Sequence, residues 1–148
     1  MEILNRKAHY NYTILETLIA GIELQGSEVK SIREGKCNIS DAYCYIYNNE
    51  VILKNSHISK YDSDKFTNHD ELRDRRLLLT KKEIRKLNQE LLTPGYTIVP
   101  LKIFNNKGLL KVLIGLCKGK KEYDKRESIK EKDANREIDR VMKNYGRY

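Results

Sequence analysis

The sequence has no tryptophan, only two prolines and no long run of uncharged apolar residues. A helix that spans a bilayer needs about 20 such residues in succession, so the sequence predicts no membrane span. The first residues, Met1 to Lys7, lack the apolar segment of a signal peptide. We therefore expect a cytoplasmic protein.

Cysteine is also scarce. Cys37, Cys44 and Cys117 are odd in number, and no two of them form a CxxC pair. This argues against both a disulfide framework and a zinc site. We expect small, reduced side chains within a sheet.

The motifs of nucleotide-binding and nucleophilic enzymes are absent. The sequence contains no GxxxxGK[ST], GxGxxG or GxSxG. His69 and Asp70 are neighbours, but adjacent side chains point apart on most backbones, which favours a structural or RNA-contacting histidine. The carboxylates are scattered among basic residues, as in solvated ion pairs. We expect no enzyme, no catalytic residue, no metal and no cofactor.

Positive charge is in excess. The 148 residues include 29 Lys and Arg against 21 Asp and Glu, which gives a formal charge of +8. This length fits one domain. Basic side chains neutralise phosphates, so nucleic acid is the leading partner class and an anionic membrane surface is second.

The composition changes near residue 118. Residues 1–118 hold nearly all of the strand-like apolar runs, whereas residues 119–148 hold 10 basic and 7 acidic side chains. We predict a folded body over 1–118 and a basic tail over 119–148 that is disordered alone. A helix about 133–146, formed when the tail is bound, is predicted from an apolar stripe. The stripe consists of Ala134, Ile138, Val141, Met142 and Tyr145.

The body begins with a long strand and a short helix. Tyr12 to Leu24 is rich in β-branched and apolar residues, and Ala20-Gly21 suggests a bulge or a sharp bend. Ser27 fits the N-cap of a helix over 28–34, which Gly35 ends.

Two hairpins follow from strand-like runs joined by polar turns. The first joins residues 43–47 to 51–53, and the second joins 97–104 to 109–117 through a turn at 105–108. Between them, a capping box at Thr80 to Glu83 opens another helix. The pattern predicts a mainly β fold: a small closed antiparallel barrel of the oligonucleotide-binding (OB) type with two or three short flanking helices.

Three tyrosines alternate along the first hairpin. Tyr43, Tyr45 and Tyr47 share one face of their strand. They either fill the core with their rings or form a platform on which RNA bases stack, and the residues favour the core.

Basic clusters recur along the chain, with tyrosines between them. Because arginine and lysine bind phosphates and tyrosine stacks on unpaired bases, we expect folded or single-stranded RNA as the ligand. The clusters are Arg6-Lys7, Lys30 with Arg33 and Lys36, Arg73 with Arg75 and Arg76, Lys81-Lys82 with Arg85-Lys86, and Lys118 with Lys120-Lys121.

Several strings occur in order over nearly the whole chain. They are Asn5-Arg6-Lys7-Ala8, Ala20-Gly21-Ile22, Gly26-Ser27-Glu28-Val29-Lys30-Ser31, Asn68-His69-Asp70, Arg73 to Leu79, Val99-Pro100-Leu101, Gly119 to Glu127, Ile129 to Asp133, and Arg136-Glu137-Ile138. Together these strings resemble the SmpB family, the SsrA-binding proteins of bacteria.

The resemblance implies an OB-type barrel that binds the tRNA-like domain of transfer-messenger RNA. It implies delivery of this RNA to stalled 70S ribosomes, with elongation factor Tu in the delivery complex. Translation then switches to the transfer-messenger RNA reading frame, which tags the nascent peptide for proteolysis. The tail is expected to lie in the empty message channel, against small-subunit ribosomal RNA near the decoding centre. We expect a monomer.

The resemblance and the basic clusters together give two sets of candidate residues. RNA contacts are expected from Asn5, Arg6, Lys7, Tyr12, Glu28, Lys30, Arg33, Lys36, Arg73, Arg75, Arg76, Lys118, Lys120 and Lys121. Ribosome contacts are expected from Tyr123, Asp124, Lys125, Arg126, Lys130, Lys132, Arg136, Ile138, Arg140, Met142 and Lys143. Glu28 either stabilises a helix N-terminus, or accepts from a base amino group or orients Lys30 and Arg33.

Some positions depart from the family pattern. Tyr10 and Asn11 stand where a histidine and an acidic residue are usual, and Lys60 replaces a common proline. Ile19 replaces an acid that the family links to RNA binding, so that role is not assigned to Ile19. Two other classes stay open from the residues alone. An RNA-cleaving enzyme needs a carboxylate cluster or a histidine pair, and a structural ribosomal protein binds without transfer-messenger RNA.

Overall fold

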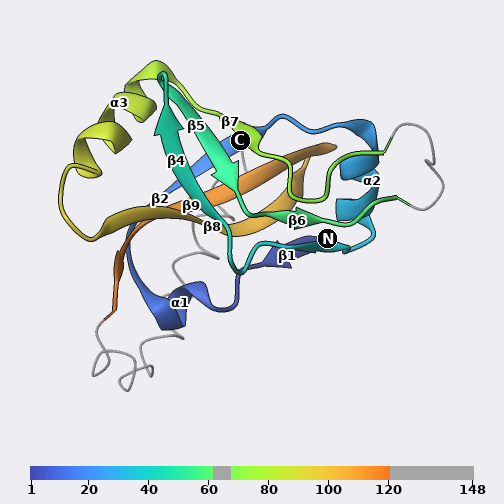
Figure 1. Cartoon of the computed structure of the whole chain (residues 1–148), viewed down its shortest axis with the longest axis horizontal. Helices are drawn as coiled ribbons and strands as arrows, with labels where there is room; N and C mark the ends of the chain where they lie inside the picture. Colours follow the sequence, from blue (N-terminus) through green and yellow to red (C-terminus); the bar gives the residue numbers. More distant parts are fainter. Residues whose placement is uncertain (62–67, 121–148) are drawn as a thin grey trace.

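The computed structural model describes residues 1–61 and 68–120 (Figure 1). The strands are β1 (Glu2–Leu4), β2 (Tyr12–Ile22), β3 (Cys37–Asn38), β4 (Tyr43–Tyr47), β5 (Glu50–Lys54), β6 (His57–Ile58), β7 (Arg75–Leu78), β8 (Tyr96–Asn106) and β9 (Leu109–Gly119). The helices are α1 (Ala8–Asn11), α2 (Gly26–Arg33) and α3 (Lys81–Glu90). Lys121 and the predicted tail helix lie outside the described residues.

Six strands close into an antiparallel ring. They pair in the order β8-β4-β5-β7-β2-β9, and β9 pairs back to β8. β1 adds to β8, while β3 and β6 form a separate pair. The helices lie around this ring, with α2 and α3 at opposite ends of it (Figure 1). The prediction of a mainly β, closed antiparallel barrel with short flanking helices is confirmed.

Both predicted hairpins are present, and each has a two-residue turn in the left-handed region. Asn48 and Asn49 have φ values of 49° and 58°, and Lys107 and Gly108 have values of 51° and 83°. Such turns match the twist of the flanking strands, and asparagine and glycine tolerate them best. The second turn is tighter than the predicted four residues, because β8 continues to Asn106.

The sequence predicts the N-terminus of α3 correctly and that of α2 only in part. Thr80 and Glu83 form the expected capping box, with the Glu83 N–H donating to Thr80 Oγ1 at 3.2 Å. The prediction of Ser27 as the N-cap of α2 is wrong. The N-cap is Gln25, whose N–H donates to the Glu28 carboxylate at 2.7 Å. Ser27 Oγ instead hydrogen-bonds to His69 Nδ1 at 2.8 Å inside the protein.

The expected irregularity of β2 lies elsewhere in the strand. The register shift against β9 falls between Ile14 and Glu16, so of the two alternatives predicted at Ala20-Gly21, a bulge or a sharp bend, the bulge is not there. Gly21 instead allows a close approach of β7. A Cβ at this position would lie only 3.1 Å from the Cβ of Leu78.

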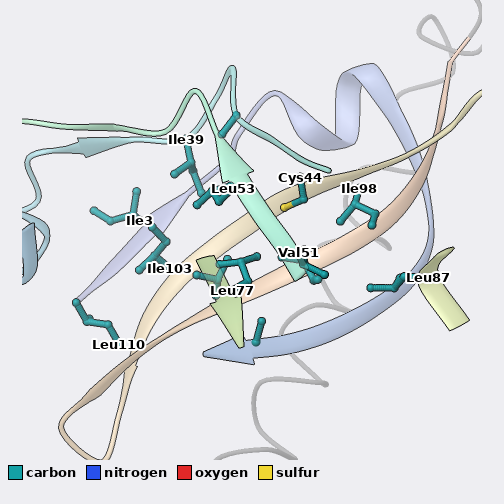
Figure 2. Close-up of a cluster of buried hydrophobic side chains, with 14 of the residues drawn as sticks. Ile3, Ile39, Cys44, Val51, Leu53, Leu77, Leu87, Ile98, Ile103 and Leu110 are labelled. Carbon is teal, nitrogen blue, oxygen red and sulfur yellow. The ribbon is translucent and has the colours of Figure 1, made fainter. Parts of the chain in front are cut away.

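Two apolar clusters hold the fold together. The larger fills the barrel, where Cys44, Val51, Leu53 and Ile98 converge (Figure 2). The smaller lies outside the ring under α1 and contains Ala8, Val99, Leu101, Phe104, Leu113 and Cys117. β8 and β9 are therefore buried on both faces. The three cysteines are free, as predicted, and burial raises the pKa of Cys117 to about 12.

The smaller cluster predicts a strong effect of adding a methyl group at Gly115. A Cβ there would lie 2.9 Å from Leu101 Cδ1 and 3.2 Å from Cys117 Sγ, and both side chains are buried. Gly115→Ala should therefore lower the free energy of unfolding by about 1–3 kcal/mol, measured by urea denaturation. Gly119→Ala is the matched control, since nothing lies within 4 Å of that Cβ. Equal stability of the two variants would contradict this packing.

Candidate RNA-binding surface

A buried ion-pair network lies between α2 and β7. The Glu28 side chain is 0% exposed and accepts from two arginines. Arg75 Nε donates to Glu28 Oε2 at 2.6 Å, and Arg73 Nη2 donates to Oε1 at 2.6 Å. Burial alone would raise the pKa of Glu28, but the hydrogen bonds from Arg73, the Gln25 backbone and Arg75 outweigh it. The pKa of Glu28 therefore lies below its usual value.

Arg75 uses its remaining donors to hold two loops. Its Nη1 donates to the Ser56 carbonyl at 2.6 Å and to Ser56 Oγ at 3.0 Å. Its Nη2 donates to the carbonyls of Asp70 and Glu71 at 3.3 Å. Burial lowers the pKa of Arg75, and the Glu28 carboxylate opposes that shift. The Arg75 guanidinium thus holds α2, Ser56 and residues 70–71 together at this end of the barrel.

This network corrects part of the predicted RNA-binding set. Glu28 and Arg75 are fully buried and bind each other, so neither can reach an RNA on this surface. Glu28 does not orient Lys30 or Arg33 either, because its two oxygens face Arg73 and Arg75. The side chain of Arg73 is 31% exposed. Its contact with Glu28 makes it part of the same structural unit.

Arg76 is exposed but paired on both sides. Its Nη2 lies 3.0 Å from Glu23 Oε1, and its Nη1 lies 3.0 Å from Glu50 Oε1. Two carboxylates therefore flank Arg76, which the sequence predicts to bind phosphate. Surface ion pairs of this kind are weak, so the two carboxylates offset the charge of Arg76 only in part and do not fix its side chain.

Two basic clusters that are far apart in the sequence meet beside α1. The Lys120 N–H donates to the Asn11 carbonyl at 2.9 Å, and Tyr12 pairs with Gly119. This brings the end of β9 to the turn that carries Arg6 and Lys7. We call the resulting surface the α1 patch; its residues are Arg6, Lys7, Lys118 and Lys120.

A second cationic surface lies on α2 and just after it. Lys30, Arg33 and Lys36, here called the α2 patch, are all exposed. Arg33 Nη2 donates to the Gly108 carbonyl at 3.0 Å, and Lys36 Nζ lies 3.4 Å from Glu34. α1 and α2 lie well apart on the barrel (Figure 1). The predicted RNA-binding residues therefore form two surfaces rather than one.

A pocket of about 300 Å³ lies between α1, the start of β4 and β8. Asn5, Lys7, Asn11, Tyr12 and Tyr43 are among its lining residues. Asn5 is only 5% exposed, and its Nδ2 donates to the Pro100 carbonyl at 2.8 Å. Its Oδ1 is buried and has no hydrogen-bond partner in the part of the chain that the structure describes. Sequence reasoning missed this pocket, because three distant segments form it.

The tyrosines of β4 point outward, so the prediction that they form core is wrong. Tyr43 is 37% and Tyr47 is 66% exposed, whereas Cys44 between them is 4% exposed. The Tyr45 hydroxyl donates to Asp74 Oδ2 at 3.3 Å, and Lys54 Nζ lies 5.9 Å from the centre of the Tyr45 ring. The inner face of β4 belongs to Cys44 and Ile46.

Residues 1–61 and 68–120 contain neither a cluster that could hold a metal ion nor a helix that could span a membrane. There, no three side chains of His, Cys, Asp or Glu gather in a way that could hold a metal ion. Among the described helices, none is long and apolar enough to cross a bilayer.

Comparison with known proteins identifies the family of this chain. A family model described as SmpB protein matches residues 2–144. The chain belongs to the SmpB family. The SsrA-binding protein of Enterococcus hirae is 52% identical over 143 residues, covering 97% of this chain and 93% of that one. The SsrA-binding protein of Ligilactobacillus salivarius is 54% identical over 142 residues, covering 96% and 92%.

A solved SmpB structure is also similar. It is described as "tmRNA-SmpB: a journey to the center of the bacterial ribosome" and has a TM-score of 0.69 and 42% identity to this chain. The match covers 86% of this chain and 94% of that one. Within this SmpB family member, Ile19 packs against the smaller apolar cluster, and Tyr10 is 47% exposed on α1. Of the four departures from the family pattern, Ile19 and Asn11 are therefore partly buried, whereas Tyr10 and Lys60 are exposed.

Proposed function

We propose that this chain binds the tRNA-like domain of transfer-messenger RNA and delivers it to stalled ribosomes, where the nascent peptide is tagged. The SmpB match over residues 2–144 carries this proposal. The solved relative, whose description joins tmRNA and SmpB with the bacterial ribosome, supports it.

The two cationic patches supply the binding chemistry. Arg6, Lys7 and Lys118 of the α1 patch, with Lys30 and Arg33 of the α2 patch, can neutralise phosphates. Because the patches lie apart on the barrel, the protein can contact two RNA segments at once. One is the tRNA-like domain, and the other is small-subunit ribosomal RNA.

The tail was predicted to begin at residue 119, but β9 includes Gly119 and Lys120 hydrogen-bonds to Asn11, so the part proposed to act on the ribosome is the chain after Lys120. Its cations, among them Lys125 and Arg126, meet the RNA walls of the empty message channel near the decoding centre. In this proposal the protein acts as a monomer, and elongation factor Tu joins the delivery complex. A structural ribosomal protein would bind without transfer-messenger RNA, so binding assays with and without that RNA separate the two functions.

We propose binding without catalysis. Carboxylates of the described surface pair with cations, as Glu16 does with Lys86 and Glu34 with Lys36, and do not gather with one another. Metal-assisted cleavage of RNA needs carboxylates or histidines grouped around an ion. RNA cleavage by the pure protein that EDTA abolishes would contradict this proposal.

The body alone should bind the RNA in a strongly salt-dependent manner. A fragment of residues 1–120 retains β9, both patches and the Lys120 contact to Asn11. With about four to eight phosphate contacts, the logarithm of affinity should fall against the logarithm of salt with a slope of about −3 to −7. Filter binding at several salt concentrations measures it.

Single variants test which cations make those contacts. Lys7→Ala and Lys118→Ala should each reduce the slope by about one. Lys60→Ala, on an exposed residue outside both patches, should leave it unchanged. A body fragment that binds no better than an uncharged barrel of similar size would refute the assignment.

A further inference from the structure

We propose that the pocket beside α1 receives one unpaired base of single-stranded RNA, and that Tyr43, Tyr45 and Tyr47 continue this site along β4. The inference rests on the proposed RNA binding and specifies its ligand at this surface. The ligand is a strand with splayed bases, not the phosphates of a duplex. We call Tyr43, Tyr45 and Tyr47 the tyrosine row.

The pocket offers what a base requires. Asn5 Oδ1 is a buried acceptor with no partner among the described residues, and such a group costs free energy until a donor reaches it. The 2.8 Å bond from Nδ2 to the Pro100 carbonyl fixes which amide atom is the oxygen. Base N–H groups and the ribose 2′-hydroxyl are donors of the right kind. Lys7, on the pocket wall, provides a cation for the attached phosphate.

The tyrosine row begins at the pocket. Tyr43 lines the pocket, and β4 then leads toward α3 (Figure 1). The turn residue Asn49 lines a second pocket together with Lys81 of α3. Residues two apart on a strand are separated by about 6.7 Å. An extended single strand with unstacked bases can follow such a spacing, placing successive bases on successive rings.

The neighbours of the row suit a polynucleotide. Lys54 pairs in register with Tyr43, and its amine lies 5.9 Å from the Tyr45 ring centre, where it can reach a phosphate. Asp74 holds the Tyr45 hydroxyl and so fixes that ring. Each ring has a charged neighbour, Lys54 opposite Tyr43, Asp74 at the Tyr45 hydroxyl and Glu50 opposite Tyr47, whereas the core of a protein interface is depleted in charge. Bases, which stack on isolated rings, are therefore the favoured occupant.

The test uses the full-length protein and a fluorescent, unstructured RNA hexamer of mixed sequence. Tyr43→Leu and Tyr47→Leu should each weaken hexamer binding by about tenfold, because stacking is lost. Tyr43→Phe and Tyr47→Phe should keep wild-type affinity. Tyr10→Leu is the matched control, since Tyr10 is 47% exposed on α1 but does not line the pocket. Circular dichroism checks that each variant is folded.

Occupancy of the pocket is measured separately. The side-chain amide signals of Asn5 should shift in NMR spectra when the hexamer is added. Hexamer affinity that is unchanged in folded leucine variants, or unshifted Asn5 signals, overturns the inference. Binding of whole transfer-messenger RNA is measured in parallel. If that RNA binds and the hexamer does not, this inference fails while the proposed function stands; if neither binds, both fail.

Discussion

Replacing Glu28 with glutamine should lower the free energy of unfolding by about 3–5 kcal/mol. The carboxylate is 0% exposed and receives hydrogen bonds of 2.6 Å from both Arg73 and Arg75. Glutamine has nearly the same shape but carries no charge, and its amide nitrogen is a donor that would face donors. The buried guanidinium of Arg75 would then lack its counter-charge.

Urea denaturation of Glu28→Gln and of a surface control measures this effect. Glu34→Gln is the matched control, because Glu34 also pairs with a cation, Lys36, but both side chains are 45% exposed. Exposed pairs contribute about 0–1 kcal/mol, so this control should remain close to the wild type. Similar stabilities of the two variants would show that the buried network is not what joins α2 to β7.

The same network makes stability depend on pH in a defined direction. The pKa of Glu28 is near 4.5 in the unfolded chain and lower in the folded protein. The unfolded state therefore binds more protons in this range, and stability falls as pH is lowered. The contribution is complete above about pH 4.5 and is lost as pH falls through the folded-state pKa. The Glu28→Gln variant should lack this part of the acid dependence.

Changing Lys125 and Arg126 to alanine should reduce tagging of stalled chains by more than about tenfold, or 1.4 kcal/mol, with RNA affinity nearly unchanged. We expect the same of polar substitutions at Ile138 and Met142, which are one helical turn, about 6 Å, apart on the predicted stripe. The proposal assigns these residues to the message channel and not to transfer-messenger RNA. Loss of the cationic pair or of the apolar stripe should therefore affect only the step on the ribosome.

Both quantities are measured on each tail variant: affinity by filter binding, and tagging yield in a translation system stalled on messages without a stop codon. Lys60→Ala, in the body and outside both patches, is the control and should leave both unchanged. Equal losses of affinity and tagging would place the tail in the RNA-binding surface. The division of the chain near residue 118 would then have to be abandoned.

Local signals in the sequence were sufficient for most of the secondary structure. Asn48, Asn49 and Gly108 mark the hairpin turns, because asparagine and glycine accept left-handed backbone more readily than other residues. The Thr80–Glu83 capping box fixed the start of α3. These features depend on residues within four positions of one another, so sequence reasoning can find them. The short elements α1, β1, β3, β6 and β7 were not predicted, because segments of two to four residues are too short to show a periodic pattern.

The sequence alone does not show which face of β4 is buried. In Tyr43-Cys44-Tyr45-Ile46-Tyr47 both faces are apolar, so alternation shows that two faces exist without showing which is inside. The tertiary structure decides it by placing Cys44 opposite Leu53 within the barrel. The larger tyrosine rings, each with a polar hydroxyl, are left on the outer face.

The sequence by itself determined the family, the barrel class and the cationic character, since these follow from strings, alternation and composition. Only the tertiary structure decided which charges are available to RNA. Glu28 and Arg75 are 47 positions apart and became a buried pair when α2 packed beside β7. Arg6 and Lys120 became neighbours of α1 when β9 closed against β2. Pairing across such distances depends on how the strands close the ring, and no local pattern records that.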